Sequence, residues 1–226
     1  MTSFTGYHGA LDLIHRVSIA TTEEFATLKP EWEARVVAPT KALIDSLGPA
    51  LTTSVSPTIQ WKSAHPGSLS PIRKDARFSR SETHPYKDHL LITFWDGPVK
   101  SEATAIRFRL EPDRVGLSVG NALMGERLER WRTTLLGPHG AEFAALVEAR
   151  LAGPGESGLF KPQLKRPAVD VPDESPVRDL LCHKNFALWW LPPSQQNLDD
   201  AEAVEWLAAC AAELAPMHRW LVEHVR

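Results

Sequence analysis

The feature that most constrains the fold is a β-hairpin pattern over residues 104–120. Within 104–110, the side chains of Thr104, Ile106, Phe108 and Leu110 alternate with those of Ala105, Arg107 and Arg109. This period of two is typical of a strand with one buried face. The next four residues, 111–114, place Pro112 at the second position of a turn. Alternation then resumes over 115–120. The pattern predicts an antiparallel hairpin and excludes an all-helical fold.

Apolar residues elsewhere complete the predicted architecture. Leu90–Trp95 and Phe186–Leu191 have the length and composition of buried strands. Apolar residues recur at helical spacing over 21–47, 123–136, 143–151 and 197–225. We therefore predict an α+β fold, in which an antiparallel sheet of about four to six strands, with a central meander, is flanked by helices from both ends of the chain.

Prolines and glycines place the expected interruptions in the first half of the chain. Thr21 and Glu24 have the spacing of a capping box at a helix start. Pro30 and Pro39 predict two short helices or one kinked helix. Gly48-Pro49 predicts the helix end. The β-branched residues of 53–61 predict a strand, which Pro57 limits to a sheet edge or a bulge.

The remaining segments are predicted to be irregular or short. Residues 1–20 have no sustained period and are expected to form an irregular arm. Residues 153–176 contain five prolines and three glycines and are expected to form a long connection. A short helix is expected over 175–184. No linker divides the expected core, so we predict one domain over 1–226.

Composition excludes several classes of protein. Apolar residues make up 43% and charged residues 23% of the chain, which is ordinary globular usage. No apolar run reaches the ~18 residues of a membrane span, and the N-terminus lacks the pattern of a secretory signal. The only cysteines are Cys182 and Cys210, too few for a disulfide scaffold. We expect a cytoplasmic protein without a membrane partner.

Charge is concentrated in the middle of the chain. The net charge is −3, yet residues 72–132 hold 12 basic and 9 acidic side chains. Arginine, abundant here, is suited to bidentate contact with carboxylate or phosphate. The interleaved acids disfavour a broad nucleic-acid face. They leave two interpretations open, a local site for a small anion or surface ion pairs.

The polar segment 72–89 is the candidate site. Its positive groups stand beside a phenol and imidazoles, which can hold an anion and transfer a proton. On the expected hairpin, two arginines project from one face. The predicted ligand-binding residues are Arg73, Arg77, Arg80, Tyr86, Lys87, His89, Arg107 and Arg109. The alternative is a structural loop in which Phe78 and Tyr86 fill the core and acids pair with the arginines.

A metal site is the sharper alternative for the same segment. His84, Asp88 and His89 have ligand chemistry, and His65 can supply a fourth group. His84 and His89 are five positions apart, with Pro85 between them, which fits neither one helix face nor one strand face. The main prediction therefore includes no metal. The chain also lacks a nucleophile elbow, a phosphate loop and a dinucleotide fingerprint, so no cofactor and no catalytic residue are predicted.

Two motifs in this region carry a resemblance to a known family. The run Arg-Lys-Asp-Ala-Arg-Phe-Ser over 73–79 is followed by Pro-Tyr-Lys over 85–87 and by His89. These motifs resemble the signature of a bacterial and fungal family catalogued as domain of unknown function 2461. The resemblance extends from the 23–47 helices to the segments 164–167 and 183–186. It implies no established activity.

Three functions remain open on the sequence alone. A binding protein or enzyme for a small anionic metabolite requires the arginines to converge in a pocket. A non-catalytic interaction module for an acidic protein or nucleic acid requires them on a flat or convex face. A metal-assisted hydrolase requires imidazoles and a carboxylate around one ion, at about 2.0–2.2 Å. The sequence contains no signal for an oligomeric state.

Overall fold

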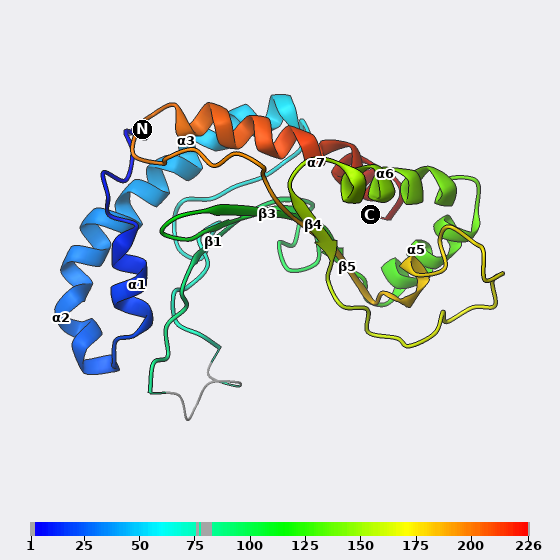
Figure 1. Ribbon diagram of the computed structural model, residues 1–226, viewed down its shortest axis with the longest axis horizontal. Helices are drawn as coiled ribbons and strands as arrows, with labels where there is room; N and C mark the ends of the chain where they lie inside the picture. Colours follow the sequence, from blue (N-terminus) through cyan, green and yellow to red (C-terminus); the bar gives the residue numbers. More distant parts are fainter. Residues whose placement is uncertain (1–2, 76, 78–82, 226) are drawn as a thin grey trace.

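A computed structural model of the chain describes residues 3–75, 77 and 83–225 (Figure 1). The elements before the sheet are α1 (Asp12–Ser18), α2 (Thr22–Trp32), the π-helical turn η1 (Glu33–Val37) and α3 (Ala38–Ser54). The first three strands are β1 (Leu90–Asp96), β2 (Thr104–Leu110) and β3 (Val115–Ala122). The remaining elements are α5 (Glu126–Leu136), α6 (Gly140–Ala152), β4 (Glu156–Leu159), η2 (Leu180–Cys182), β5 (Asn185–Leu191) and α7 (Ala203–Val225).

The strands form one five-stranded sheet in the order β1-β2-β3-β5-β4, with every neighbouring pair antiparallel. Leu110 opposes Val115 across the predicted turn, and Phe108 opposes Leu117. The hairpin and the α+β class predicted from the sequence are confirmed. The meander continues to β1, where Ile92 opposes Phe108.

Helices from both ends of the chain pack on one face of this sheet. Helix α7 contacts β2 and β3, and α3 packs beside α7; Figure 1 shows the two lying together across the strands. Phe94 and Phe108 are fully buried on this face, with ring centroids 5.8 Å apart in an edge-to-face arrangement. In the described part of the chain, no helix covers the opposite face (Figure 1).

The first helices form a longer continuous run than the sequence predicts. The capping box at Thr21 and Glu24 is present. Pro30 and Pro39 do not separate the helices, because η1 inserts a π-helical turn between α2 and α3. A π-helical turn accommodates an interrupted hydrogen-bond ladder within a helix.

The predicted helix end at Gly48-Pro49 is wrong, as is the strand over 53–61. Helix α3 continues through both residues to Ser54, since α7 packs along it. Gly48 permits the close approach of the Trp61 indole, because a Cβ at position 48 would overlap that ring. Residues 55–61 then return to the sheet, and among them only Gln60 forms an isolated bridge, to Trp95.

Three other expectations are corrected. Residues 1–20 are not an irregular arm throughout, since they include α1. The 153–176 connection contributes strand β4, which pairs with β5. Residues 175–184 form turns and the short 3₁₀ helix η2 instead of an α-helix. None of the described helices combines the length and apolar character that a membrane crossing demands.

Candidate functional site

The described ends of the 72–89 segment, residues 72–75 and 83–89, pair antiparallel as a ribbon that leads into β1. The backbone N–H of Lys74 donates to the carbonyl of Pro85 at 2.8 Å, and that of Lys87 donates to Ile72 at 2.9 Å. Arg73 and Tyr86 therefore lie opposite each other in an antiparallel bridge. Arg80 and Phe78, both named in the sequence analysis, lie outside the described residues.

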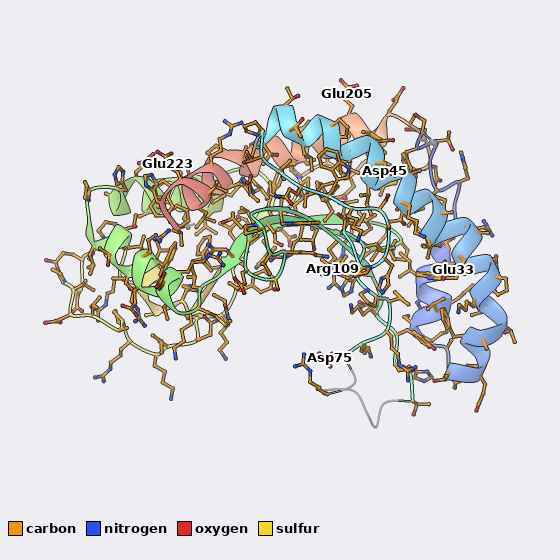
Figure 2. The ribbon with its side chains drawn as sticks, turned by 180° about the vertical axis from the view of Figure 1, so that it is seen from behind. Glu33, Asp45, Asp75, Arg109, Glu205 and Glu223 are labelled. Carbon is orange, nitrogen blue, oxygen red and sulfur yellow. The ribbon has the colours of Figure 1, made fainter. Side chains whose placement is uncertain are left out.

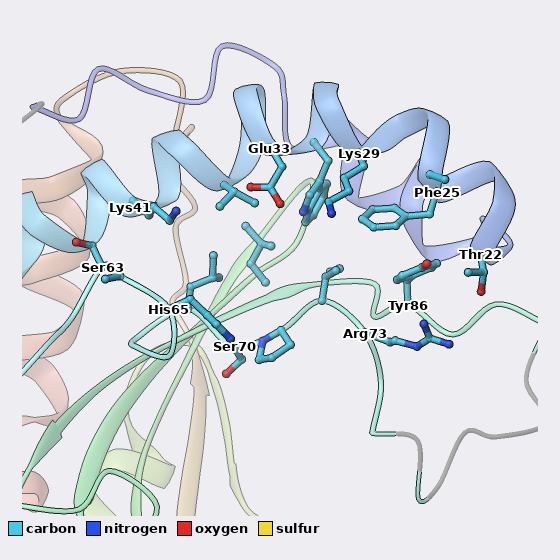
Figure 3. A pocket seen from close by; sticks show the side chains of 18 residues that line it. Thr22, Phe25, Lys29, Glu33, Lys41, Ser63, His65, Ser70, Arg73 and Tyr86 are labelled. Carbon is cyan, nitrogen blue, oxygen red and sulfur yellow. The ribbon is translucent and has the colours of Figure 1, made fainter.

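A cavity of about 550 Å³ lies where this ribbon meets the N-terminal helices. One wall is the α2–η1–α3 run, and the other is the loop of residues 63–73 (Figure 3). Side chains that form its apolar interior are Trp32, Val37, Leu69, Ile72, Tyr86 and Leu90.

Hydrogen bonds fix the loop wall between the helix and the sheet. Ser63 Oγ donates to the Asp45 carboxylate of α3 at 2.9 Å. The backbone N–H of Ser70 donates to Leu91 at 2.9 Å, and Leu69 bridges to Ile92 of β1. Both walls are therefore held by elements of the core, so the cavity is part of the folded architecture.

Charged groups surround the opening of the cavity. Lys29 and Lys41 come from the helices and Arg73 comes from the ribbon, while Glu33 supplies one carboxylate (Figure 3). His65 adds an imidazole from the loop. Among the residues that the structure describes, none of the three cationic side chains forms a hydrogen bond or an ion pair. Lys29, Lys41 and Arg73 together with Glu33 therefore give the opening two more formal positive charges than negative ones.

Tyr86 is the aromatic centre of the interior. It is 4% exposed, and its ring lies 4.5 Å from the ring of Phe25, centroid to centroid. Its hydroxyl forms no hydrogen bond within the described part of the chain. This phenol therefore offers a polar atom in an otherwise apolar interior, the usual arrangement that orients a bound small molecule.

Arg109 and His89 lie in a separate, ion-paired cluster. Arg109 contacts Glu111 at 2.5 Å and Asp88 at 3.2 Å, and Asp88 accepts from His89 Nδ1 at 2.6 Å. Burial opposes ionisation of Glu111, but hydrogen bonds from Arg114 and Arg109 outweigh it and lower its pKa. Burial, reinforced by the Arg109 charge, lowers the pKa of His89. These charges neutralise one another, as the ion-pair alternative predicted.

Arg77 and Lys87 also have partners, one within the ribbon and one directly before it. Arg77 contacts Asp75 at 2.5 Å, and this hydrogen-bonded pair lowers the pKa of Asp75 to about 2. The Lys87 ammonium donates to the carbonyl of Pro71 at 2.7 Å, and burial lowers its pKa. Neither side chain is among those that line the cavity.

Arg107 lies on the helix-free face of the sheet, apart from Arg73. It is half-buried, and burial lowers its pKa. Nearby Lys100 donates to the carbonyl of Gly67 and lies 5.8 Å from the centre of the Trp95 ring. Figure 2 shows Arg109 on the same helix-free side. Of the seven predicted ligand-binding residues that the structure describes, therefore, only Arg73 and Tyr86 line the cavity.

The residues of the metal alternative do not come together. In the described ranges, three ligand-type side chains have donor atoms within 4.8 Å of one another only at His139, Glu142 and His224. His84 therefore does not complete a ligand set with Asp88 and His89. His65 lines the cavity instead.

Sequence reasoning missed Lys29, Glu33 and Lys41. They are exposed helix residues, which single-sequence patterns cannot distinguish from an ordinary solvated face.

Comparison with known families agrees with the motifs of the ribbon. A family model described as a conserved hypothetical protein, DUF2461, matches residues 22–220. A comparison with curated proteins gave no match. Since the family match runs from the first residue of α2 into α7 and includes the whole sheet and cavity, the chain belongs to the DUF2461 family.

Proposed function

We propose that this protein binds a small molecule with an apolar body and an anionic group, in the cavity between the α2–η1–α3 run and the 63–73 loop. The observation that carries the proposal is a set of three cations, Lys29, Lys41 and Arg73, that have no hydrogen-bond or ion-pair partner among the described residues and that surround an apolar interior. Surface cations commonly form ion pairs with nearby acids. Here Glu33 can balance only one of the three positive charges, so two remain to attract the anionic group of a ligand.

The chemistry of the cavity selects for both parts of such a ligand. Its volume lies in the range of about 300–1,000 Å³ that small-molecule sites have. The interior favours an apolar body, because burial of apolar surface contributes roughly 25 cal/mol per Å². The Arg73 guanidinium matches a carboxylate or phosphate in two parallel hydrogen bonds.

The π-helical turn adds a second line of support. Glu33 and Val37, the first and last residues of η1, both line the cavity. π-helical insertions occur often at functional sites, because they re-aim side chains that a regular helix would place elsewhere. The proposal concerns binding and assigns no catalytic step.

The other two functions have less support from the described residues. Arg77 and Arg109 are ion-paired and Arg107 is half-buried, so they provide little free positive surface for an acidic protein or nucleic acid. The ligands proposed for a hydrolytic metal do not converge.

Both cysteines are buried and neither forms a disulfide. Free thiols fit the reducing, cytoplasmic setting that we propose for this protein.

Thermal unfolding with matched amphiphiles tests the proposal. Decanoate and decyl phosphate should raise the melting temperature, whereas decanol should not, because only the anions meet the charged opening. A ligand that binds only the folded state at a hundredfold excess over its Kd stabilises that state by about 2.7 kcal/mol.

Variants distinguish the cavity from the general surface. Arg73→Ala and Lys41→Ala should each reduce the decanoate shift, while Lys161→Ala, an exposed cation outside the cavity, should keep it. Equal shifts with decanol, or equal shifts in all three variants, would refute the proposal.

A further inference from the structure

A second cluster of polar side chains lies at the other end of the molecule. His139 and Glu142 belong to the start of α6, and His224 belongs to the last turn of α7. Their donor atoms all lie within 4.8 Å of one another. His139 Nδ1 is 3.7 Å from Glu142 Oε2, and the two imidazole rings stack with centroids 4.3 Å apart.

We infer that His139, Glu142 and His224 form a binding site for a divalent transition-metal ion of the Zn²⁺ class. Two imidazoles and one carboxylate are a ligand set typical of zinc, with a water in the fourth tetrahedral position. This site is distinct from the proposed anion cavity and shares no residue with it.

The distances require only small movements of the side chains. Ligand atoms bound at 2.0–2.1 Å around a tetrahedral zinc lie about 3.3 Å apart. The separation of 3.7 Å between His139 and Glu142 is close to that value. His139 and Glu142 are exposed and His224 is half-exposed, so rotation about their side-chain bonds can close the remaining gap.

The core holds the backbone of all three residues in place. Phe143, next to Glu142, stacks on Trp220 at 4.2 Å, and Trp220 is one turn before His224. Trp131 of α5 packs edge-on against both rings. Thr134 Oγ1 also donates to the carbonyl of His224 at 3.3 Å. The ligands are therefore presented by two helices, α6 and α7, which one aromatic cluster packs together with α5, as a preformed metal site requires.

A bound ion would clamp the start of α6 to the end of α7. The two elements are about eighty residues apart in sequence, and the ion would add a direct link between their side chains. Because an ion that binds only the folded state stabilises that state, zinc should raise the melting temperature of the protein.

Zinc titration of the full, tag-free chain tests the inference. A chromogenic chelator in competition should report one zinc ion bound per chain. His139→Ala and Glu142→Gln should each weaken binding by at least about tenfold, since loss of a supporting outer-shell group alone costs about 10–100-fold. His15→Ala, an exposed histidine of α1 outside the cluster, is the matched control and should bind as the wild type does.

A spectroscopic measurement reports the geometry independently. Co²⁺ in the same site should show the intense ligand-field absorption of tetrahedral cobalt, which His139→Ala should abolish. Both variants alter exposed side chains, so they should melt as the wild type does without metal. Absence of stoichiometric zinc binding, or an affinity that His139→Ala and Glu142→Gln leave unchanged, would overturn the inference.

Discussion

His218 is a buried titratable residue in the core of α7. Its side chain is 0% exposed, and neither ring nitrogen has a hydrogen-bond partner in the described structure. Burial lowers its pKa to about 4, Asp96 of β1 opposes the shift, and Arg219 reinforces it. Asp96 is itself held by hydroxyl donors from Ser56 and Thr58 at 2.5 and 2.7 Å.

This residue should make the fold sensitive to mild acid. An unfolded histidine titrates near 6.5, above the folded value of about 4. Between these values the unfolded chain binds more protons, so stability is complete above about pH 6.5 and falls as the pH decreases toward 4. The contribution at stake is roughly 3 kcal/mol.

Urea unfolding of wild type and His218→Leu from pH 7 to pH 4.5 measures this contribution. The wild type should lose more free energy of unfolding than the variant over that range. Burial lowers the pKa of His89 and His183 too, but both remain in the variant, so the difference isolates His218. Parallel pH profiles would contradict the assignment.

At the scale of elements, local patterns predicted the parts of the fold that local interactions determine. The β2–β3 hairpin follows from alternation and a proline turn within seventeen residues of sequence. Phe108 lies on its predicted buried face and packs against Phe94.

Phe108→Ala should therefore reduce the free energy of unfolding by about 3–5 kcal/mol, because it leaves a large cavity between β2 and α7. Phe160 is 50% exposed and provides the matched control. Phe160→Ala should change stability by no more than about 0.5 kcal/mol. Chemical denaturation compares the two, and equal effects would mean that the apolar face of β2 contributes little to the core.

Elements whose limits depend on distant contacts were mispredicted. Gly48-Pro49 reads as a helix end, yet α3 continues because α7 supports it and Trp61 packs on Gly48. No local pattern contains that contact. The candidate site was predicted incompletely for the same reason, because local patterns contain no tertiary contacts. Arg73 and Tyr86 lie in one polar segment and were predicted, whereas Lys29 and Lys41 reach the same cavity only through tertiary packing.

The contact between Gly48 and Trp61 gives an element-scale prediction. Alanine is favoured over glycine within helices by about 1 kcal/mol, yet Gly48→Ala should destabilise the protein, because its Cβ overlaps the Trp61 indole. In a Trp61→Ala background, the same substitution should become neutral or stabilising. A double-mutant cycle of unfolding free energies measures this coupling, and additive effects would contradict it.

At the scale of the whole molecule, the chain has the shape of an arch, with α1 and α2 at one end, α5 and α6 at the other, and the sheet between them (Figure 1). The two proposed sites occupy opposite ends. The anion cavity joins α2 and α3 to the ribbon of the family motif, and the proposed metal cluster joins α6 to α7. Only the first contains residues of the motif that marks the family.

The central claim is that the cavity itself holds the anion. The most direct measurement is isothermal titration of decanoate into wild type and Ala26→Trp. Ala26 lines the cavity from an exposed position on α2, so an indole there fills the opening while all three cations remain. We predict saturable binding at one site in the wild type and at least a tenfold loss in Ala26→Trp, with an unchanged melting temperature in the absence of ligand. Equal affinity in the two proteins would contradict the account, because the anion would then bind outside the cavity.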